Sequence, residues 1–194
     1  MKKVLNVGGN SRKIGIPEFY NGWECQLLDI DPDLEPDICC DARDLLSYQS
    51  DIYDSVYCSH NLEHYYRHEA KRVLAGFRKI LKPDGFTFIR VPDIHAVIKE
   101  ILAKNIDIED TLYESAVGPI TAIDVIYGYQ KEIQESGNDY FAHKNGFTQK
   151  SLKKLLEESG FQAVYVCKGP LEVWAYAFQS IPSKEYRNLL GLPD

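Results

Sequence analysis

Two glycines and one acid occur in this sequence at a spacing that suits the binding of a nucleoside. Gly8 and Gly9 follow a short apolar run, and Asp29 comes 20 residues after Gly9. Glycine after a strand lets a ligand approach the backbone closely, and an acid about 20 residues further on can accept hydrogen bonds from ribose hydroxyls. Two plainer interpretations stay open, a simple Gly-Gly turn and a surface acid at a strand end. The glycine fingerprint of dinucleotide-binding proteins and the phosphate-binding loop are both missing, which favours a ligand without phosphates.

Histidine is the second residue type in this sequence that could do chemistry. His60, Glu63 and His64 are close together in the sequence, and His143 lies far downstream. An imidazole can act as a general base near neutral pH, and imidazole together with carboxylate can bind a divalent metal. The plainest alternative for residues 60–64 is a surface loop and the first turn of a helix. For His143 the alternatives are packing within a lid and contact with a substrate.

Five short apolar runs predict the strands that would position these residues. Buried parallel strands have nearly continuous apolar sequences, which here end at glycine or at polar residues. The expected strands cover residues 4–7, 26–30, 37–41, 55–59 and 86–91. Ligands of such sheets bind at the carboxyl ends of the strands, where the strand order reverses. The glycines, Asp29, Asp41 and the histidine-rich segment all fall at those ends.

Two helices and a closing hairpin complete the expected core. Apolar residues recur with a helical period over residues 68–81, and a second helix is expected at residues 149–159 with Thr148 as its N-cap. Residues 162–167 and 171–178 are separated by a link too short for a parallel crossover, so they must pair antiparallel. The sequence therefore predicts an α/β fold with a mainly parallel sheet, helices on its faces and an antiparallel C-terminal hairpin.

Residues 93–147 do not fit the alternation of strands and helices. They contain ten carboxylates and four lysines, so nearly all of the net charge of −7 resides there. Residues 94–102 are expected to form a helix. Because a segment of this length between core elements is usually functional, we interpret it as a lid or substrate wall. The 194 residues are then a single domain with 93–147 as its inserted segment.

Composition excludes several other classes of protein. No run of about 18 apolar residues is present, so no membrane insertion is expected, and the N-terminus lacks the apolar run of a signal peptide. The five cysteines form no C-x-x-C pair, which favours a reducing, cytoplasmic location. The acidic balance argues against a nucleic-acid partner bound through bulk charge. The oligomeric state is not indicated by any of these features.

Six motifs, taken together, carry a family resemblance. They are Leu5-Asn6-Val7-Gly8-Gly9, Leu28-Asp29-Ile30-Asp31, Asp41-Ala42-Arg43-Asp44-Leu45, Tyr57-Cys58-Ser59-His60-Asn61-Leu62-Glu63-His64, Ile80-Leu81-Lys82-Pro83-Asp84-Gly85 and Glu158-Ser159-Gly160-Phe161. The set resembles class I S-adenosylmethionine-dependent methyltransferases, in particular the small type 11 and ubiquinone-biosynthesis groups, over about residues 4–91 and 147–178. The resemblance implies a Rossmann-like, seven-stranded sheet whose antiparallel seventh strand comes from the closing hairpin. It also implies S-adenosyl-L-methionine as the cofactor and S-adenosyl-L-homocysteine as the product.

The resemblance implies cofactor contacts after the first two strands. Gly8, Gly9 and Asn10 would line the methionine end of the cofactor. Asp29 would bind the ribose hydroxyls, and Ile30 would pack on the adenine.

Further cofactor contacts are implied after the third and fourth strands. Asp41 would accept a hydrogen bond from the adenine amino group, and the Ala42 amide would face the ring. An N-cap is an equal alternative for Asp41, because it precedes a helix-like run. Ser59 and His60 would lie beside the sulfonium and its methyl group.

Catalytic roles are expected among the histidines. An oxygen acceptor needs a general base, for which His60 is the first choice and His143 the second, with His64 as a further candidate. Some related methyltransferases hold a divalent ion with an E-x-x-E-H motif and a later histidine. Here the motif is His60-x-x-Glu63-His64, and His143 could supply the fourth ligand. Our main interpretation assigns no metal site.

The function expected from these observations is S-adenosylmethionine-dependent methyl transfer to a small molecule or glycan, with an oxygen acceptor favoured. One alternative is a methyltransferase-like cofactor-binding or regulatory module with weak catalysis, because Asn10-Ser11 stands where the family usually has another glycine. A second alternative is a nicotinamide oxidoreductase.

Overall fold

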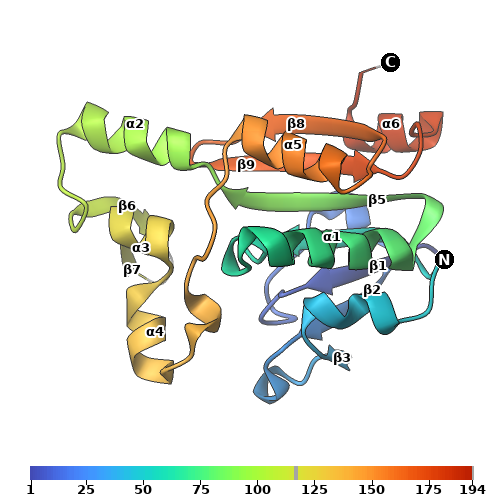
Figure 1. Ribbon diagram of the computed structural model, residues 1–194, viewed down its shortest axis with the longest axis horizontal. Helices are drawn as coiled ribbons and strands as arrows, with labels where there is room; N and C mark the ends of the chain where they lie inside the picture. The colour runs from blue at the N-terminus through green and yellow to red at the C-terminus, as the bar shows by residue number, and fades with distance from the viewer. Residues whose placement is uncertain (116–117, 194) are drawn as a thin grey trace.

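The structure is a computed structural model that describes residues 1–115 and 118–193. Its main sheet has seven strands in the order β3-β2-β1-β4-β5-β9-β8, and a separate two-stranded sheet pairs β6 with β7 (Figure 1). The main strands are β1 (Lys3–Val7), β2 (Glu24–Asp29), β3 (Ile38–Cys39), β4 (Tyr53–Ser59), β5 (Leu81–Pro92), β8 (Ala163–Lys168) and β9 (Glu172–Phe178). Strands β1 to β5 are parallel, while β9 runs antiparallel to both β5 and β8. The predicted Rossmann-like sheet with an antiparallel C-terminal hairpin is confirmed.

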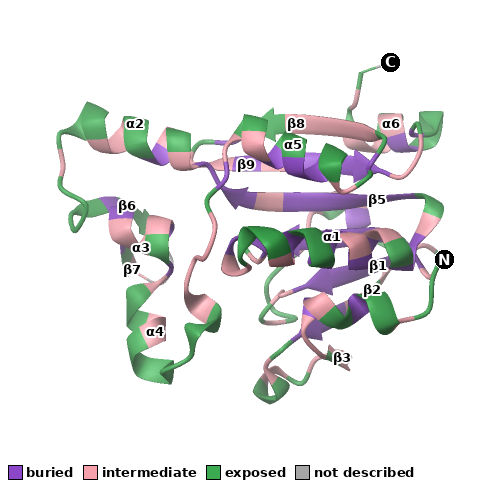
Figure 2. Cartoon of the chain, in the orientation of Figure 1, coloured by how far each residue is buried: buried purple, intermediate pink, exposed green. Residues whose placement is uncertain are grey.

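Side chains of the central strands alternate between two cores, one on each face of the sheet. Leu5 and Val56 belong to one core, whereas the adjacent Val4 and Tyr57 belong to the other. Helices cover both faces, and Figure 2 shows β1 and β5 buried behind helix α1. The first core is covered by the 3-10 helix η3 (Ala42–Ser47), α1 (Arg67–Ile80) and α5 (Gln149–Glu158), and the second by η1 (Glu18–Tyr20) and α6 (Lys184–Leu190).

Helix α1 forms where the apolar period predicted it. Val73, Leu74, Phe77 and Ile80 share one face and are fully buried against the sheet. Burying side chains of this size stabilises the fold by about 1.5–3 kcal/mol each. The helix ends at Ile80, one residue earlier than expected, because Leu81 is already extended and opens β5.

The closing α5–β8–β9 unit also matches its prediction. Thr148 caps α5 by accepting a hydrogen bond from the amide of Ser151 (3.2 Å). Gly160 follows the helix with φ of +90°, a conformation that L side chains rarely adopt. The hairpin then returns the chain to β5, so that β9 contributes Glu172 near the carboxyl end of that strand.

Strand β3 is shorter than expected, and its flanking acids explain why. Asp37 accepts a hydrogen bond from the amide of Leu27 on β2 (2.7 Å) through its side chain. Asp41 caps η3 instead of continuing the strand. Only Ile38 and Cys39 remain in the ladder.

The inserted segment, residues 93–147, folds beside the sheet around a small core of its own. Its elements are α2 (Ile94–Lys104), β6 (Thr111–Ser115), β7 (Gly118–Thr121), α3 (Ala122–Tyr127), α4 (Gln130–Ser136) and the 3-10 helix η5 (Asp139–Phe141). Val97, Leu112, Ile120 and Val125 form its buried cluster. Figure 1 shows β6, β7, α3 and α4 set apart from the main sheet, facing the strand ends. No helix in the described part of the chain is long and apolar enough to span a membrane.

Candidate active site

The carboxyl ends of β1, β2 and β4 open onto one cavity of about 720 Å³, called here the strand-end cavity. Seven of the nine residues predicted to bind the cofactor line it, together with the predicted catalytic His64. The seven are Gly8, Gly9, Asn10, Asp29, Ile30, Ser59 and His60. The reversal of strand order between β1 and β4 thus brings together residues from three separate stretches of sequence.

Asp29 lies at the end of β2 with its carboxylate at the cavity wall. Its side chain accepts hydrogen bonds from the amides of Asn10 (3.1 Å) and Asp31 (3.2 Å). A carboxylate offers about four acceptor sites, so two remain for a ligand. The residue is 8% exposed, so these sites lie at the edge of a low-dielectric interior. The Asp29 carboxylate only accepts hydrogen bonds and has two acceptor sites unused. It therefore fits the two hydroxyl donors of a ribose.

The loop after β1 keeps the backbone shape that its glycines suggest. Gly8 has φ of +65°, and a Cβ there would come within 2.1 Å of the Asn61 side chain. Asn10 also has a left-handed backbone, with φ of +57°. Asparagine adopts this conformation more readily than other side chains, so it can replace the expected glycine without changing the loop.

Asp41 and Ala42 do not line either of the cavities described here. The Asp41 carboxylate accepts hydrogen bonds from the amide of Arg43 (2.8 Å) and from its Nε (2.9 Å). These bonds outweigh the effect of burial, which alone would raise its pKa, and they hold that pKa below its usual range. Asp41 caps η3, as its alternative interpretation predicted, and neither Asp41 nor Ala42 lines the strand-end cavity.

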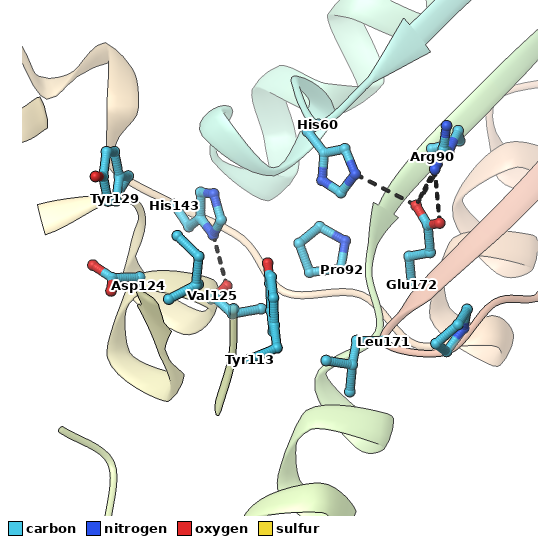
Figure 3. A pocket seen from close by; sticks show the side chains of 12 residues that line it. His60, Arg90, Pro92, Tyr113, Asp124, Val125, Tyr129, His143, Leu171 and Glu172 are labelled. Carbon is cyan, nitrogen blue, oxygen red and sulfur yellow. Dashed lines mark hydrogen bonds and ion pairs between the residues drawn. The ribbon is translucent and has the colours of Figure 1, made fainter. Parts of the chain in front are cut away.

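A second cavity of about 530 Å³, the insert cavity, lies between the main sheet and the inserted segment (Figure 3). Its wall combines apolar side chains with a few charged and titratable ones. It is lined by His60, Arg90, Pro92, Tyr113, Ile120, Asp124, Val125, Tyr129, His143, Pro170, Leu171 and Glu172. His60 and Tyr129 line both cavities, so the two spaces adjoin at these residues.

His60 is held between two carboxylates. Its Nδ1 lies 3.5 Å from Glu63 Oε1, and its Nε2 lies 3.4 Å from Glu172 Oε2. Burial alone would lower the pKa of His60, but the two carboxylates outweigh it and raise that pKa to about 9. The ring is therefore protonated at neutral pH and cannot accept a proton there. Its φ of +50° is a strained conformation of the kind that clusters at functional sites.

Glu172 and Arg90 complete this charged group, and sequence reasoning missed both. Arg90 Nη2 donates to Glu172 Oε1 (2.7 Å), and its Nε donates to Oε2 (3.1 Å). Burial opposes ionisation of Glu172, but His60 and Arg90 lower its pKa to about 2. A usable indication did exist, because Arg90 is the one charge within the apolar run 86–91 and a charge in a buried strand needs a partner.

His64 and His143 face each other beside the insert cavity. His143 Nδ1 lies 2.9 Å from the carbonyl oxygen of Val125, and His64 Nδ1 lies 3.2 Å from that of Ala142. A carbonyl oxygen can only accept, so each Nδ1 carries the hydrogen and donates it. Burial lowers the pKa of His143, against the opposing effect of Glu63, so its ring is neutral at pH 7. The two rings are 4.8 Å apart between centroids.

Glu63 lies next to both rings and is 1% exposed. Among the described residues, neither of its side-chain oxygens has a hydrogen-bond partner. Burial would raise the pKa of Glu63, but His60 outweighs it and keeps that pKa below its usual range. Its backbone oxygen accepts the amides of Lys144 (2.8 Å) and Asn145 (3.0 Å), which fastens the end of the inserted segment to the 3-10 helix η4 (Leu62–His64). We call Glu63, His64 and His143 the histidine cluster.

Residues 1–166 match a family model described as a methyltransferase domain. No curated protein matches the sequence. Among solved structures, the chain is similar to an S-adenosylmethionine-dependent methyltransferase from Archaeoglobus fulgidus, with 17% identity, a TM-score of 0.57 and coverage of 91% of this chain and 85% of the other. It is similar to a protein from Pyrococcus horikoshii, with 18% identity, a TM-score of 0.56 and coverage of 92% and 82%.

A third similar structure contains bound ligands. It is the 1,6-didemethyltoxoflavin N1-methyltransferase of Burkholderia thailandensis with 1,6-didemethyltoxoflavin and S-adenosylhomocysteine, with 14% identity, a TM-score of 0.51 and coverage of 90% of this chain and 69% of the other. At these identities the structures confirm the fold alone, while the family model carries the family assignment.

Proposed function

The chain belongs to the family of methyltransferase domains, and from this membership we propose that it methylates a hydroxyl group of a small organic molecule held in the insert cavity. The chain is an S-adenosylmethionine-dependent methyltransferase. We propose the chemical class of the acceptor, the cavity that binds it and the residues that promote the loss of its proton. It also assigns the cofactor to the strand-end cavity.

The observation that carries this proposal is that two cavities adjoin at His60. The strand-end cavity offers the half-used carboxylate of Asp29 for a ribose and the partly exposed Ile30 as an apolar surface for a base. The insert cavity offers a space of about 530 Å³, within the range of small-molecule sites. A methyl group delivered from the first to the second has to pass the His60 side chain.

The lining of the insert cavity favours a compact acceptor with an apolar body. Pro92, Ile120, Val125 and Leu171 supply apolar walls, whereas Asp124 adds an acidic group. These walls suit an aromatic or aliphatic hydroxyl compound better than a glycan, whose many hydroxyls would lose water without gaining partners. A phosphorylated acceptor is disfavoured by the acidic inserted segment.

When bound, S-adenosylmethionine supplies a methyl group on a positively charged sulfur that a nucleophile can displace in line. The chain's own contribution is then mainly orientation, which can be worth about 7–11 kcal/mol. His60, protonated between Glu63 and Glu172, has both ring N–H groups facing these carboxylates, so it holds the two acids in place and forms a positively charged part of the wall beside the acceptor. The histidine cluster, on the other side of the same wall, is the part of the site suited to promote loss of the hydroxyl proton. This assignment replaces the expectation that His60 is the base.

The imperfect glycine loop does not favour the binding-module alternative. Asn10 supplies the left-handed backbone that the loop requires, and Asp29 holds that loop through the Asn10 amide. We therefore expect cofactor binding and turnover to be retained.

The experiment that tests this proposal blocks the insert cavity and leaves the strand-end cavity open. Leu171→Trp places a large side chain in the partly buried wall of the insert cavity. We expect turnover of hydroxylated aromatic and aliphatic compounds to fall at least about tenfold, because misplacing the acceptor removes its orientation. Affinity for S-adenosylhomocysteine, measured by calorimetry, should stay within about twofold.

Ile98→Trp is the matched control, because Ile98 is exposed on α2 and lines neither cavity.

Transfer of labelled methyl groups should give methyl ethers and leave the corresponding amines unlabelled. Label found on amines alone, or turnover unaffected by Leu171→Trp, would remove the proposed acceptor and its site.

A further inference from the structure

The three side chains of the histidine cluster converge with the geometry of a ligand set. One donor atom each from Glu63, His64 and His143 lies within 4.8 Å of the others. Two of these residues are adjacent in η4, and the third comes from the end of the inserted segment. Ligand atoms around a tetrahedral zinc ion are about 3.3 Å apart, given metal–ligand bonds of about 2 Å. Small side-chain rotations would close the remaining gap.

Both imidazoles are held in the tautomer that a metal requires. Each Nδ1–H donates to a backbone carbonyl, that of Ala142 for His64 and that of Val125 for His143. This leaves the lone pair of each Nε2 for a ligand. Metal-binding histidines almost always donate their other ring N–H in this way, which fixes the ring and raises its basicity. A packing role for the two rings would not call for this arrangement in both.

Glu63 is a buried carboxylate that lacks a sufficient partner. Neither side-chain oxygen has a hydrogen bond among the described residues, and the residue is 1% exposed. His60 Nδ1 lies 3.5 Å from Oε1, which leaves Oε2 free to bind a cation. A buried carboxylate without hydrogen bonds is costly, and coordination to a metal is one of the few arrangements that offset the cost.

The backbone around the cluster holds its three residues in place. The Glu63 carbonyl accepts the amides of Lys144 and Asn145, and the His143 amide donates to Tyr127. The first two bonds tie η4 to the inserted segment, and the third holds His143 within that segment. Its ligands are therefore fixed by main-chain hydrogen bonds and not by surface side chains alone.

We propose that Glu63, His64 and His143 bind a divalent transition-metal cation in the wall between the two cavities. Two imidazole nitrogens and one carboxylate suit zinc, cobalt, manganese or iron in their divalent states, and they suit magnesium poorly because it prefers oxygen ligands alone. Three protein ligands leave at least one coordination position open, as in catalytic zinc sites. Because His143 lines the insert cavity and His64 lines the strand-end cavity, the ion would lie between them.

A second part of this inference rests on the proposed function. The open position of the ion takes the acceptor's hydroxyl oxygen. A bound cation lowers the pKa of a coordinated hydroxyl, so its proton is lost to solvent at neutral pH without a free base. The ion would undergo no redox change. A carbon–oxygen bond would form as the carbon–sulfur bond of S-adenosylmethionine breaks, with neutral S-adenosylhomocysteine as the leaving group.

The test measures metal binding directly, with the full chain and without acceptor. The protein is stripped with a chelator and titrated with Co²⁺, whose visible absorption reports its coordination. We expect one Co²⁺ per chain with nitrogen–oxygen coordination, displaced by Zn²⁺ and not by Mg²⁺. In Glu63→Gln and His143→Asn the affinity should fall by at least about 100-fold, because each loses a direct ligand. Circular dichroism checks that both variants fold, and His64→Asn provides a third variant.

His68→Asn and His95→Asn are the matched controls, because both histidines are exposed and lie outside the cluster. Their Co²⁺ affinity should equal that of the unmodified chain. The inference is overturned if Co²⁺ does not bind, or if it binds equally well to the folded cluster variants. Binding of S-adenosylhomocysteine is measured on the same samples. If that binding persists while Co²⁺ fails to bind, only the metal site is lost, whereas the opposite result removes the proposed function and keeps the metal site.

Discussion

The two cavities of this protein are built in different ways. The strand-end cavity is formed mainly by short loops directly after β1, β2 and β4, which the main sheet core fixes, while the inserted segment adds Tyr129, Glu132, Tyr140 and Phe141 to its wall. The insert cavity takes one wall from β5 and β9 and the other from the inserted segment, which has only a small core of its own. The proposed cofactor side is therefore set mainly by the sheet, while the proposed acceptor side depends more on a satellite unit.

This difference suggests a division of labour within one domain. A cofactor common to a family can be held by a rigid sheet, because its shape does not vary. The acceptor side can change by exchanging the inserted segment without disturbing the sheet. Such satellite clusters open with a smaller free-energy cost than the main core, as ligand-binding regions commonly do.

Truncating a buried leucine should reduce stability much more in the main core than in the inserted segment. Leu74 is fully buried on α1, and Leu112 is 1% exposed on β6 in the inserted segment. Leu74→Ala should lower the free energy of global unfolding by about 3 kcal/mol, because it leaves a cavity in the main core. Leu112→Ala should lower it by less than about 1 kcal/mol, because the small core can open locally while the sheet stays folded.

Denaturant unfolding followed by hydrogen exchange measures both effects. Leu112→Ala should lose amide protection within residues 94–143 and keep it in β4 and β5. If both variants lose the same global stability and amide protection falls throughout the chain, the sheet and the inserted segment unfold as one cooperative unit. The proposed difference between the two regions would then be wrong.

The sequence was sufficient to predict which strand-end residues line the strand-end cavity, because each of them is adjacent to a strand that shows in the apolar pattern. Gly8, Asp29 and Ser59 end apolar runs, so placing the strands also placed the residues. Asp41 shows where the pattern alone is ambiguous. Its side chain can cap a helix or bind a ligand, and only the position of Arg43 decides between them.

The acceptor side could not be predicted in the same way. Arg90 and Glu172 meet because β9 pairs antiparallel with β5, with Trp174 opposite Arg90 and Glu172 opposite Pro92. That register is a tertiary property of strands separated by about 80 residues. His143 reaches Glu63 only because the inserted segment folds back and pairs its backbone with η4.

Asp29 allows a separate test of the strand-end cavity. Asp29→Asn keeps the size of the side chain but removes the charge and one acceptor oxygen. Hydrogen bonds to charged groups are worth about 1.5–3 kcal/mol, so affinity for S-adenosylhomocysteine should fall roughly 10- to 100-fold. Calorimetry measures the dissociation constant, and the melting temperature is recorded beside it, because the asparagine keeps only one of the two oxygens that accept the Asn10 and Asp31 amides.

Asp33→Asn is the control, since Asp33 is exposed nearby and does not line the cavity. Its dissociation constant should match that of the unmodified chain. An unchanged constant in Asp29→Asn would mean that the ribose is held elsewhere, and the strand-end cavity would lose its assigned ligand.

His60 lines both cavities. Its protonation is expected to make stability depend weakly on pH. Its folded-state pKa of about 9 lies above the ordinary value of 6.5, because Glu63 and Glu172 favour the charged ring. The stability that these ion pairs contribute is fully present below about pH 6.5 and is lost as the pH rises through about 9. Half of the side chain is exposed, so solvent screening keeps the contribution small.

The measurement compares melting temperatures of the unmodified chain and His60→Gln between pH 6 and pH 10. The unmodified chain should be the more stable of the two near pH 6, and this advantage should disappear by pH 10. His68→Gln, at an exposed site, should show no such trend. If the difference is instead constant across this range, His60 is neutral in the folded protein. It could then accept the acceptor's proton, and the histidine cluster would no longer be needed for that step.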